Sequence, residues 1–325
     1  MQKGQAFMIN PGKISLIAWI AAVFSIVWIT LLAFAEFIVG ERHGLSALIT
    51  YMPQLPLGIP IFISLALSIR AGKRRVILLN IVIMIVFVVV FMGFNFGFGK
   101  HADSAQICVM TWNVHGGINN AQNVLSVIEQ NSPDAVFLQE VDDFSPLIIG
   151  LKANGWNVVK AYDVAVASRH ALASPSTFLL LPDSGRRALV TKMSAPGGWL
   201  NLVCVHFGSD VSGAPQSRSK THLCGNIESR SVQVRNLIEK TKKSRTIIAG
   251  DFNMPPRGVV YYRLARRFPN TSAAELGLGY TYPSRFPLLR IDHILTTPDL
   301  HPMSCKTVTT RASDHLPVVA RIALN

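Results

Sequence analysis

Three long apolar runs occupy most of the first hundred residues of this chain, at residues 14–35, 44–69 and 76–99. Each run is long enough to cross the roughly 30 Å of hydrocarbon in a bilayer as a helix, and the first and last contain no break. The first run is too long for a cleaved signal peptide and is followed by two others. The sequence therefore predicts a three-helix transmembrane region over residues 14–99, preceded by a tail at residues 1–13.

The middle run is the least regular of the three because it contains Pro53, Pro56 and Pro60. Proline bends a helix, so this run either crosses the bilayer or forms a re-entrant segment. Basic residues gather in the tail and in the loop after the second run, namely Lys3, Lys13, Arg70, Lys73, Arg74 and Arg75. The positive-inside rule places both stretches in the cytoplasm. Three crossings then predict a multi-pass integral membrane protein with everything after Gly99 outside the cytoplasm. If the middle run is re-entrant instead, the residues after Gly99 are predicted to lie in the cytoplasm.

The net charge of +13 is divided between the two parts of the chain. Residues 1–100 hold eight Lys or Arg against two acidic residues, an excess that the membrane topology explains. Residues 101–325 hold 23 Lys or Arg against 16 acidic residues. A moderately basic domain favours a phosphate-bearing substrate or an anionic membrane surface without choosing between them, and an ordinary solvated surface has the same composition.

Beyond a linker at residues 100–104, apolar strands alternate with amphipathic segments. One predicted strand begins at Ile107 and another at Ala135, and the helix expected between them spans residues 121–130. This strand–helix–strand order indicates an α/β layered fold.

Most of these strands end in polar side chains that can carry chemistry. The strand that begins at Thr246 runs into Gly250-Asp251-Phe252-Asn253, which places a carboxylate and a carboxamide on the same side of an extended chain. The same design recurs along the chain and gives the set Asn113, Glu140, His206, Asp251, Asn253, Asp292, Asp314 and His315. Singly, each has an alternative role as a turn residue, a helix cap, a core histidine or an arginine partner. Together at one sheet edge they would suit Mg²⁺ or Mn²⁺ and a phosphate, and no Cys or His spacing indicates structural zinc.

Six motifs in a fixed order resemble those of the endonuclease/exonuclease/phosphatase superfamily, which has the deoxyribonuclease I-like fold. They are Trp112–Val114, Leu138–Val141, Val205–Phe207, Gly250–Asn253, Arg290–Ile294 and Ser313–Pro317. The resemblance covers about residues 105–325 and does not extend to residues 1–100. It implies a catalytic domain built as a four-layer α/β sandwich, with two mixed β-sheets face to face, helices outside and the site at one rim. It also implies a hydrolase of phosphoesters, since the group includes nucleases, sphingomyelinases and inositol-phosphate phosphatases.

The resemblance further implies a divalent metal cofactor, Mg²⁺ with Mn²⁺ as the alternative. Glu140 is similar to the family's metal-binding glutamate, and Asn113 is similar to the amide beside the metal and the phosphate. Asp314 is implied as a second ligand of metal or water.

Five residues resemble the catalytic groups of the family. Asp251 corresponds to the aspartate that orients or deprotonates the attacking water, and Asn253 is its companion. His206 is similar to the histidine that contacts the phosphate. Asp292 is implied to orient His315 and to keep it charged, so that the imidazolium stabilises the charge that develops on the phosphoryl oxygens.

Substrate and phosphate contacts are less well defined by the sequence. Arg169, Arg187 and Arg230 are candidate phosphate contacts, and solvated or structural arginines are an equal alternative. A nucleic-acid substrate would use a basic, aromatic-bearing surface, whereas a phospholipid headgroup would be approached through an apolar lip beside the bilayer, such as residues 286–289. A non-catalytic receptor on the same fold is disfavoured because Glu140, Asp251, Asn253 and His315 are all present. His115 has no assigned role.

Overall fold

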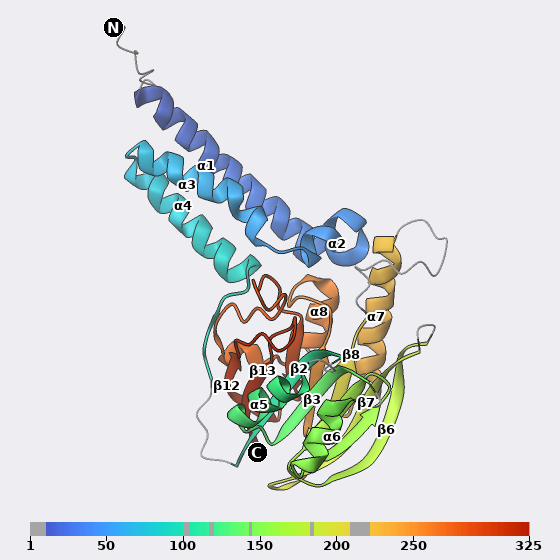
Figure 1. Ribbon diagram of the computed structural model, residues 1–325. Helices are drawn as coiled ribbons and strands as arrows, with labels where there is room; N and C mark the ends of the chain where they lie inside the picture. Colours follow the sequence, from blue (N-terminus) through green and yellow to red (C-terminus); the bar gives the residue numbers. More distant parts are fainter. Residues whose placement is uncertain are drawn as a thin grey trace.

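The computed structural model of the chain describes residues 11–99, 105–116, 120–142, 145–182, 185–208 and 222–324. Figure 1 shows an elongated bundle of helices attached to one end of a β-sandwich. The first helix begins at the tip of the bundle that lies farthest from the sandwich.

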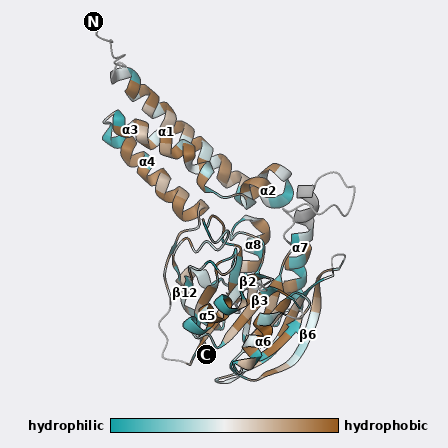
Figure 2. Ribbon diagram, in the orientation of Figure 1, coloured by the Kyte–Doolittle hydropathy of each residue, from teal (hydrophilic) through white to brown (hydrophobic). Residues whose placement is uncertain are grey.

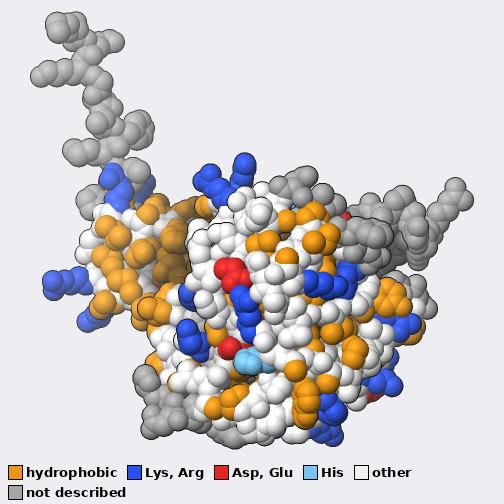
Figure 3. Space-filling model, turned by 60° about the horizontal axis from the view of Figure 1, so that its bottom comes forward, with side chains coloured by type: hydrophobic (Ala, Val, Ile, Leu, Met, Phe, Trp, Pro, Cys, Tyr) orange, Lys and Arg blue, Asp and Glu red, His pale blue; other side chains and the backbone are white. Residues whose placement is uncertain are grey.

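The bundle is apolar along its length. Helix α1 (Pro11–Ala33) continues into the π-helix η1 (Phe34–Val39), and α3 (Ile59–Arg70) packs against both α1 and α4 (Arg74–Val86). Helix α4 continues into the π-helix η4 (Phe87–Phe91). Many outward side chains of these helices are large, exposed and hydrophobic (Figure 3), and hydrophobic residues predominate along the bundle (Figure 2). Water does not solvate such a surface favourably, so it is typical of helices that face lipid.

Among the residues that the structure describes, two helices are long and apolar enough to span a membrane, Gly12–Arg42 and Arg74–Phe91. The middle run differs from the prediction of one regular span. Its two helical parts, Gly44–Tyr51 (which is α2) and Leu55–Arg70, meet at an angle of 98°, so a third crossing exists only if this bent pair counts as one span. The prolines expected to bend the run lie at this break and just beyond it. Residues 92–99, predicted as part of the last span, are not helical.

Several short elements complete the bundle and the sandwich. They are the 3-10 helices η2 (Gly40–Arg42), η3 (Leu55–Gly58) and η6 (Thr271–Ala274), together with the paired two-residue strands β1 (Asn95–Phe96) and β10 (Leu276–Gly277).

Two sheets form the sandwich. The five-stranded sheet has the order β11-β9-β8-β7-β6, with strands Leu172–Leu181 (β6), Arg186–Ala195 (β7), Gly198–His206 (β8), Thr246–Asp251 (β9) and Asp292–Thr296 (β11). The six-stranded sheet has the order β12-β13-β2-β3-β5-β4, with strands Gln106–Gly116 (β2), Ala135–Val141 (β3), Asn157–Ala161 (β4), Val164–Ser168 (β5), Leu300–Thr307 (β12) and Val318–Leu324 (β13). The pairs β2–β3 and β8–β9 are parallel and the other neighbours are antiparallel, so both sheets are mixed.

Helices cover both outer faces and complete four layers. The outer elements are α5 (Ala121–Asn131), α6 (Pro146–Ala153), α7 (His222–Lys240) and α8 (Gly258–Ala265). Phe137 and Leu202 lie in the core between the sheets, while Trp112 packs under α5 and α6 and Phe252 packs under α7 and α8. Successive residues of one strand enter different cores, as strand geometry requires: on β3, Phe137 faces the other sheet, whereas Val136 and Leu138 face the helices. The predicted four-layer α/β sandwich is confirmed.

Strand register brings the polar strand ends to one rim. Because β8 and β9 run parallel, His206 lies opposite Asp251, and the antiparallel β11 places Asp292 opposite Asp251 on the other side. Gly250 makes this close packing possible. A Cβ at that position would lie 1.9 Å from the carbonyl oxygen of Val205, so no larger residue fits there.

The helical bundle is fixed to the end of the sandwich that carries this rim. Arg257 follows the Gly250–Asn253 motif, is 5% exposed, and donates hydrogen bonds to the carbonyl oxygens of Thr50 (2.7 Å), Met52 (3.1 Å) and Phe91 (3.2 Å). Those carbonyls belong to the ends of α2 and η4. One guanidinium therefore joins two segments of the bundle to the loop beside the site.

A second contact uses the first turn of α8. Glu41 accepts hydrogen bonds from the backbone N–H groups of Val259 (2.9 Å) and Val260 (3.3 Å), where a helix N-terminus favours a carboxylate. Gly258 has a φ of +84°, and a Cβ there would lie 2.2 Å from Glu41 Oε1. The bundle and the sandwich consequently form one packed unit, with α8 directly beneath the helices in Figure 1.

Candidate active site

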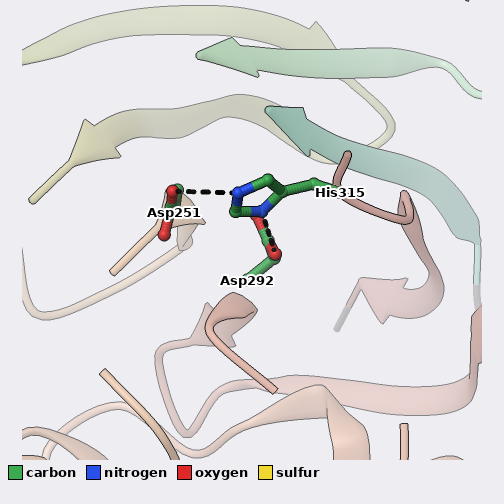
Figure 4. A group of neighbouring side chains, drawn as sticks. All are labelled: Asp251, Asp292 and His315. Carbon is green, nitrogen blue, oxygen red and sulfur yellow. Dashed lines mark hydrogen bonds and ion pairs between the residues drawn. The ribbon is translucent and has the colours of Figure 1, made fainter. Parts of the chain in front are cut away.

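Three buried side chains form the centre of the rim, as Figure 4 shows. Asp251 ends β9, Asp292 begins β11, and His315 comes from the loop before β13. His315 Nδ1 lies 2.9 Å from Asp292 Oδ2, and His315 Nε2 lies 3.9 Å from Asp251 Oδ2. The imidazole therefore bridges two carboxylates, one at hydrogen-bond distance and one slightly farther away.

The charges of this trio are set by burial and by one another. Burial alone would lower the pKa of His315, but the charge and hydrogen bond of Asp292 outweigh it and raise that pKa to about 10. Burial raises the pKa of Asp251, and the neighbouring Asp292 raises it further. His315 is thus a cation across the neutral pH range, and Asp251 is a more basic carboxylate than an exposed aspartate.

Asn113 and Asn253 hold the carboxylates in place. The Asn113 side-chain amide donates to Glu140 Oε1 (2.9 Å) and to Asp251 Oδ2 (3.0 Å). The backbone N–H of Asn253 donates to Asp251 Oδ1 (2.7 Å), and its side chain donates to the carbonyl oxygen of Phe207 (3.0 Å). Glu140 and Asn253 both have positive φ angles, 55° and 46°. Such conformations are uncommon outside glycine and tend to cluster at functional sites.

His206 enters from the opposite side of Asp251. Its Nδ1 lies 2.7 Å from Asp163 Oδ2, and its Nε2 lies 3.8 Å from both Glu140 Oε1 and Asp251 Oδ2. Within the part of the chain that the structure describes, this buried Nε2 has no hydrogen-bond partner. A buried polar atom normally has one, so this nitrogen is in a position to bind a ligand.

Two charged residues of the site were not predicted from the sequence. Asp163 binds His206, and Arg186 lies 3.3 Å from His206 Nδ1 and 3.6 Å from Asp163 Oδ2. Burial opposes ionisation of Asp163, but its hydrogen bond to His206 and the charges of His206 and Arg186 lower its pKa overall. Asp163 directly precedes β5, and Arg186 is the first residue of β7. Because β5 is antiparallel to β3 and β7 is antiparallel to β8, the starts of these strands lie at the rim where β3 and β8 end.

An aromatic ring also contacts the catalytic centre. The Tyr282 ring lies 4.7 Å from the His315 ring, centroid to centroid. Tyr282 was not predicted from the sequence, because its contact with His315 depends on the conformation of the loop after Tyr280.

The predicted metal ligands Glu140 and Asp314 are 37% and 43% exposed, in contrast to the buried trio. Asp251, Asp292 and His315 offer atoms within 4.8 Å of one another, and Asp292 Oδ1 has no hydrogen-bond partner among the described residues, but a cation there would compete with the imidazolium at Asp292 Oδ2. Carboxylate oxygens reachable from solvent suit a hard divalent cation better. Glu140 and Asp314 each offer such an oxygen, and the Asn113 side chain lies next to Glu140.

The three candidate phosphate arginines are engaged elsewhere. Arg169 lies at the other end of the sheet, where it pairs with Glu129 and packs over Trp156. Arg230 is buried in α7 beneath the Tyr51 ring, at 4.3 Å.

Arg187 lies over the Tyr162 ring at 5.3 Å and donates to Thr177. The arginine that reaches the site histidine is its neighbour, Arg186. The structure therefore does not bring Arg169 or Arg230 to the buried trio, and it places Arg186 rather than Arg187 beside His206.

The sandwich, with its rim of carboxylates, amides and imidazoles, corresponds to a known family. The sequence profile of the Endonuclease/Exonuclease/phosphatase family matches residues 110–315, a range that contains every predicted catalytic and metal-binding residue. The chain belongs to this family. Its members are generally hydrolases of phosphoester bonds and depend on divalent metals. No curated protein sequence matches the chain.

Solved structures share the fold at low sequence identity. A family member from Bacteroides vulgatus is 21% identical with a TM-score of 0.56, covering 68% of this chain and 99% of that one. The human Nocturnin catalytic domain with bound sulfate anion is 18% identical with a TM-score of 0.53, covering 68% and 94%. D. rerio TDP2 complexed with a single-strand DNA product is 20% identical with a TM-score of 0.51, covering 67% and 98%. These likenesses establish the fold alone.

Proposed function

We propose that this protein is a membrane-anchored, divalent-metal-dependent phosphoesterase, which hydrolyses a phosphodiester or phosphomonoester by in-line attack of water. The observation that carries the proposal is the position of Asp251, a buried carboxylate between the His315 and His206 imidazoles. A base with a raised pKa beside two potential donors to phosphate oxygens is the arrangement that this reaction requires.

Each residue then has a defined role. Asp251 accepts a proton from the attacking water, and Asn253 holds that carboxylate in position. His315, kept protonated by Asp292, and His206, held by Asp163, donate to the phosphoryl oxygens as their charge grows. A divalent cation at the Glu140 and Asp314 side, Mg²⁺ or Mn²⁺, supplies further positive charge there.

The bundle supports membrane attachment through residues 11–91. The turn that contains Lys73, between α3 and α4, lies at the same far end of the bundle as the start of α1, and Lys and Arg gather at that end (Figure 3). With the bent α2–α3 pair counted as one crossing, the positive-inside rule puts this end in the cytoplasm and the sandwich outside it.

A fusion experiment tests this topology. Alkaline phosphatase fused after Gly99 should be active, and a fluorescent protein that matures only in the cytoplasm should stay dark at the same position. The same reporters fused after Gly72, between α3 and α4, provide the matched control and should give the reverse pattern. A cytoplasmic signal after Gly99 would contradict the proposed side and favour an intracellular substrate.

Between a phospholipid headgroup and a nucleic acid, the position of the site favours the headgroup. The segment from Tyr280 to Arg290 touches both the site and the end of the last span. Tyr280 donates to the carbonyl oxygen of Met92 (3.1 Å) and Arg290 donates to that of Gly93 (2.7 Å), while Tyr282 packs on His315. A substrate at the bilayer surface would therefore lie close to the catalytic centre, and a nucleic acid remains the alternative.

The function is tested with the full-length protein in lipid nanodiscs and a panel of phospholipids, sphingomyelin, inositol phosphates, DNA and RNA. Hydrolysis should stop in EDTA and return with Mg²⁺ or Mn²⁺. Glu140→Gln should raise the metal concentration needed for half-maximal rate by about 10-fold or more, because it removes the charge of one ligand. Activity that survives chelation would contradict the metal site, and faster turnover of DNA or RNA than of lipids would select the alternative substrate.

A further inference from the structure

Two short paired strands join the last apolar helix to the segment that reaches the site. We call residues 94–98, which contain β1, and residues 276–279, which contain β10, the aromatic ribbon. The two strands are antiparallel, and Phe96 lies opposite Leu276. Strand β1 begins four residues after η4 ends, and the chain after β10 leads directly to Tyr280. The ribbon is therefore continuous with the bundle on one side and with the segment beside the site on the other.

The side chains of the aromatic ribbon form an exposed apolar surface. Phe96, Phe98 and Leu276 are 52%, 79% and 75% exposed. The Phe96 ring lies 5.4 Å from the Phe94 ring and 5.9 Å from the Phe98 ring, centroid to centroid. The ribbon contains no Asp, Glu, Lys or Arg. Single exposed apolar residues are ordinary, whereas a contiguous group of them indicates a surface that binds a partner.

The partner that this surface fits is the bilayer, because the ribbon continues from a helix that faces lipid. It also carries the Phe and Leu side chains with which interfacial segments enter the boundary between headgroups and acyl chains. That boundary layer is thin, about 5–8 Å on each side of the hydrocarbon. The ribbon fits this layer only if it runs along the membrane surface and not away from it.

The direction of the chain after the last helix meets this requirement. A strand advances about 3.3 Å per residue, so the chain from Phe91 to Phe98 would extend about 23 Å from the hydrocarbon if it continued along the helix axis. Figure 1 shows a different course. The axis of α4 runs from upper left to lower right, whereas the chain that follows turns to the left and descends along the side of the sandwich. The ribbon thus extends sideways from the end of the bundle.

We propose that the aromatic ribbon lies in the interfacial layer of the bilayer and holds the catalytic rim against the lipid headgroups. This inference rests on the proposed membrane attachment and adds a fixed orientation of the sandwich to it. Leu276 lies six residues before Tyr282, whose ring packs on His315 at 4.7 Å. Tyr280 and Arg290 bind the backbone just before the ribbon. Docking of the ribbon therefore sets the height of the rim above the membrane and favours a substrate whose phosphate lies in the headgroup layer.

Fluorescence quenching tests the position of the ribbon in the full-length protein in phosphatidylcholine nanodiscs. An environment-sensitive fluorophore is attached at Phe98→Cys or Leu276→Cys in a Cys224→Ser background, since the other three cysteines are buried. Trp199→Cys is the matched control because Trp199 is 49% exposed and lies near the start of β8, whose other end reaches the rim. Nitroxide-labelled lipids should quench both ribbon positions, and aqueous iodide should quench the control position much more strongly than either of them.

Substitutions within the ribbon provide the second measurement. Phe96→Ser together with Phe98→Ser should shift the equilibrium between the docked and the undocked sandwich by about 10-fold or more, the usual effect of losing buried phenylalanine side chains. The loss appears as weaker nitroxide quenching at Leu276→Cys. Phe96→Leu together with Phe98→Leu should retain that quenching, because apolar area remains. Hydrolysis of phospholipid in the disc should fall in the serine variant, whereas hydrolysis of a water-soluble phosphoester should stay at the parent rate.

Iodide quenching that is equal at Phe98→Cys and Trp199→Cys, with no quenching by nitroxide lipids, overturns the inference. It leaves the phosphoesterase assignment intact, since hydrolysis of the water-soluble substrate does not depend on the ribbon. Ribbon positions that are shielded from both quenchers also overturn the inference, because a second copy of the chain would then cover them. Failure of the parent protein to enter the discs would reject both the inference and the proposed membrane attachment.

Discussion

Asp251→Asn should lower kcat by about 10²–10⁴-fold while leaving the protein folded. The asparagine has the same shape and its oxygen can still accept the backbone N–H of Asn253, but its NH₂ group replaces the oxygen that accepts from Asn113, and it cannot accept a proton from water. Because Asp251 is buried beside Asp292, removing its charge relieves desolvation and repulsion, which offsets the lost attraction to His315 and the lost hydrogen bond from Asn113, so the free energy of unfolding should change little. The rate loss should therefore appear in kcat, with little change in substrate affinity.

The matched control for this variant is Asp134→Asn. Asp134 is an aspartate that pairs with a histidine at the other end of the sandwich and accepts the backbone N–H of Cys108, so its replacement removes the charge of a His–Asp pair without touching the site. Steady-state rates on a substrate that the parent hydrolyses, together with thermal unfolding, compare the two variants. Near-parent turnover in Asp251→Asn would show that Asp251 is not the general base. The half-exposed Asp163 would then be the next candidate for that role.

The rim of the sandwich could be predicted from the sequence because its residues lie at the ends of recognisable strands. An apolar run that ends in Glu140, His206 or Asp251 predicts both a buried strand and a polar site residue at its end. Parallel neighbours then bring those ends together. The pairs β2–β3 and β8–β9 have this arrangement in the structure.

Asp163 and Arg186 escaped prediction for a related reason. Asp163 directly precedes β5 and Arg186 begins β7, and only an antiparallel neighbour brings the start of a strand to the rim where other strands end. The direction of a strand relative to its neighbour depends on how distant segments pair in the sheet. A local sequence pattern gives no information about that pairing. A polar residue at the start of an apolar strand therefore merits the same attention as one at its end.

Arginine partners were the least predictable feature of the sequence. Arg230 was a candidate phosphate contact and instead lies beneath Tyr51 of α2, while Arg257 joins the loop beside the site to the carbonyls of Thr50, Met52 and Phe91. Both contacts span more than 150 residues of sequence. Hydropathy predicted apolar helices before residue 92, but the packing of those helices on the sandwich depends on partners that no local segment specifies.

Asp292→Asn should move the alkaline limit of activity to lower pH. In the parent, Asp292 raises the pKa of His315 from 6.5 to about 10, so the imidazolium is present throughout the range from pH 6 to pH 9. Without the carboxylate, burial opposes the remaining charges of Asp251 and Asp314, and the pKa of His315 falls back towards its ordinary value of 6.5. At pH 8 only a few per cent of His315 would then be protonated, a loss of about 30-fold or more in rate from this cause alone.

The same change has a stability signature with a defined sign. A histidine whose pKa is raised by folding stabilises the folded state below its unfolded pKa of about 6.5, and this contribution disappears as the pH rises through about 10. In the parent, the free energy of unfolding should therefore decline between those values, and Asp292→Asn should lack that decline.

Rate–pH profiles at saturating metal and melting curves from pH 6 to pH 10 measure both effects, with Asp134→Asn as the control for a surface His–Asp pair. A fall in rate that is equal at every pH would show that Asp292 orients His315 without setting its charge. An unchanged profile would show that the reaction does not use the His315 imidazolium. The expected pattern, a rate that recovers towards pH 6 in Asp292→Asn, follows only if the positive charge of His315 acts on the phosphoryl oxygens and Asp292 maintains that charge.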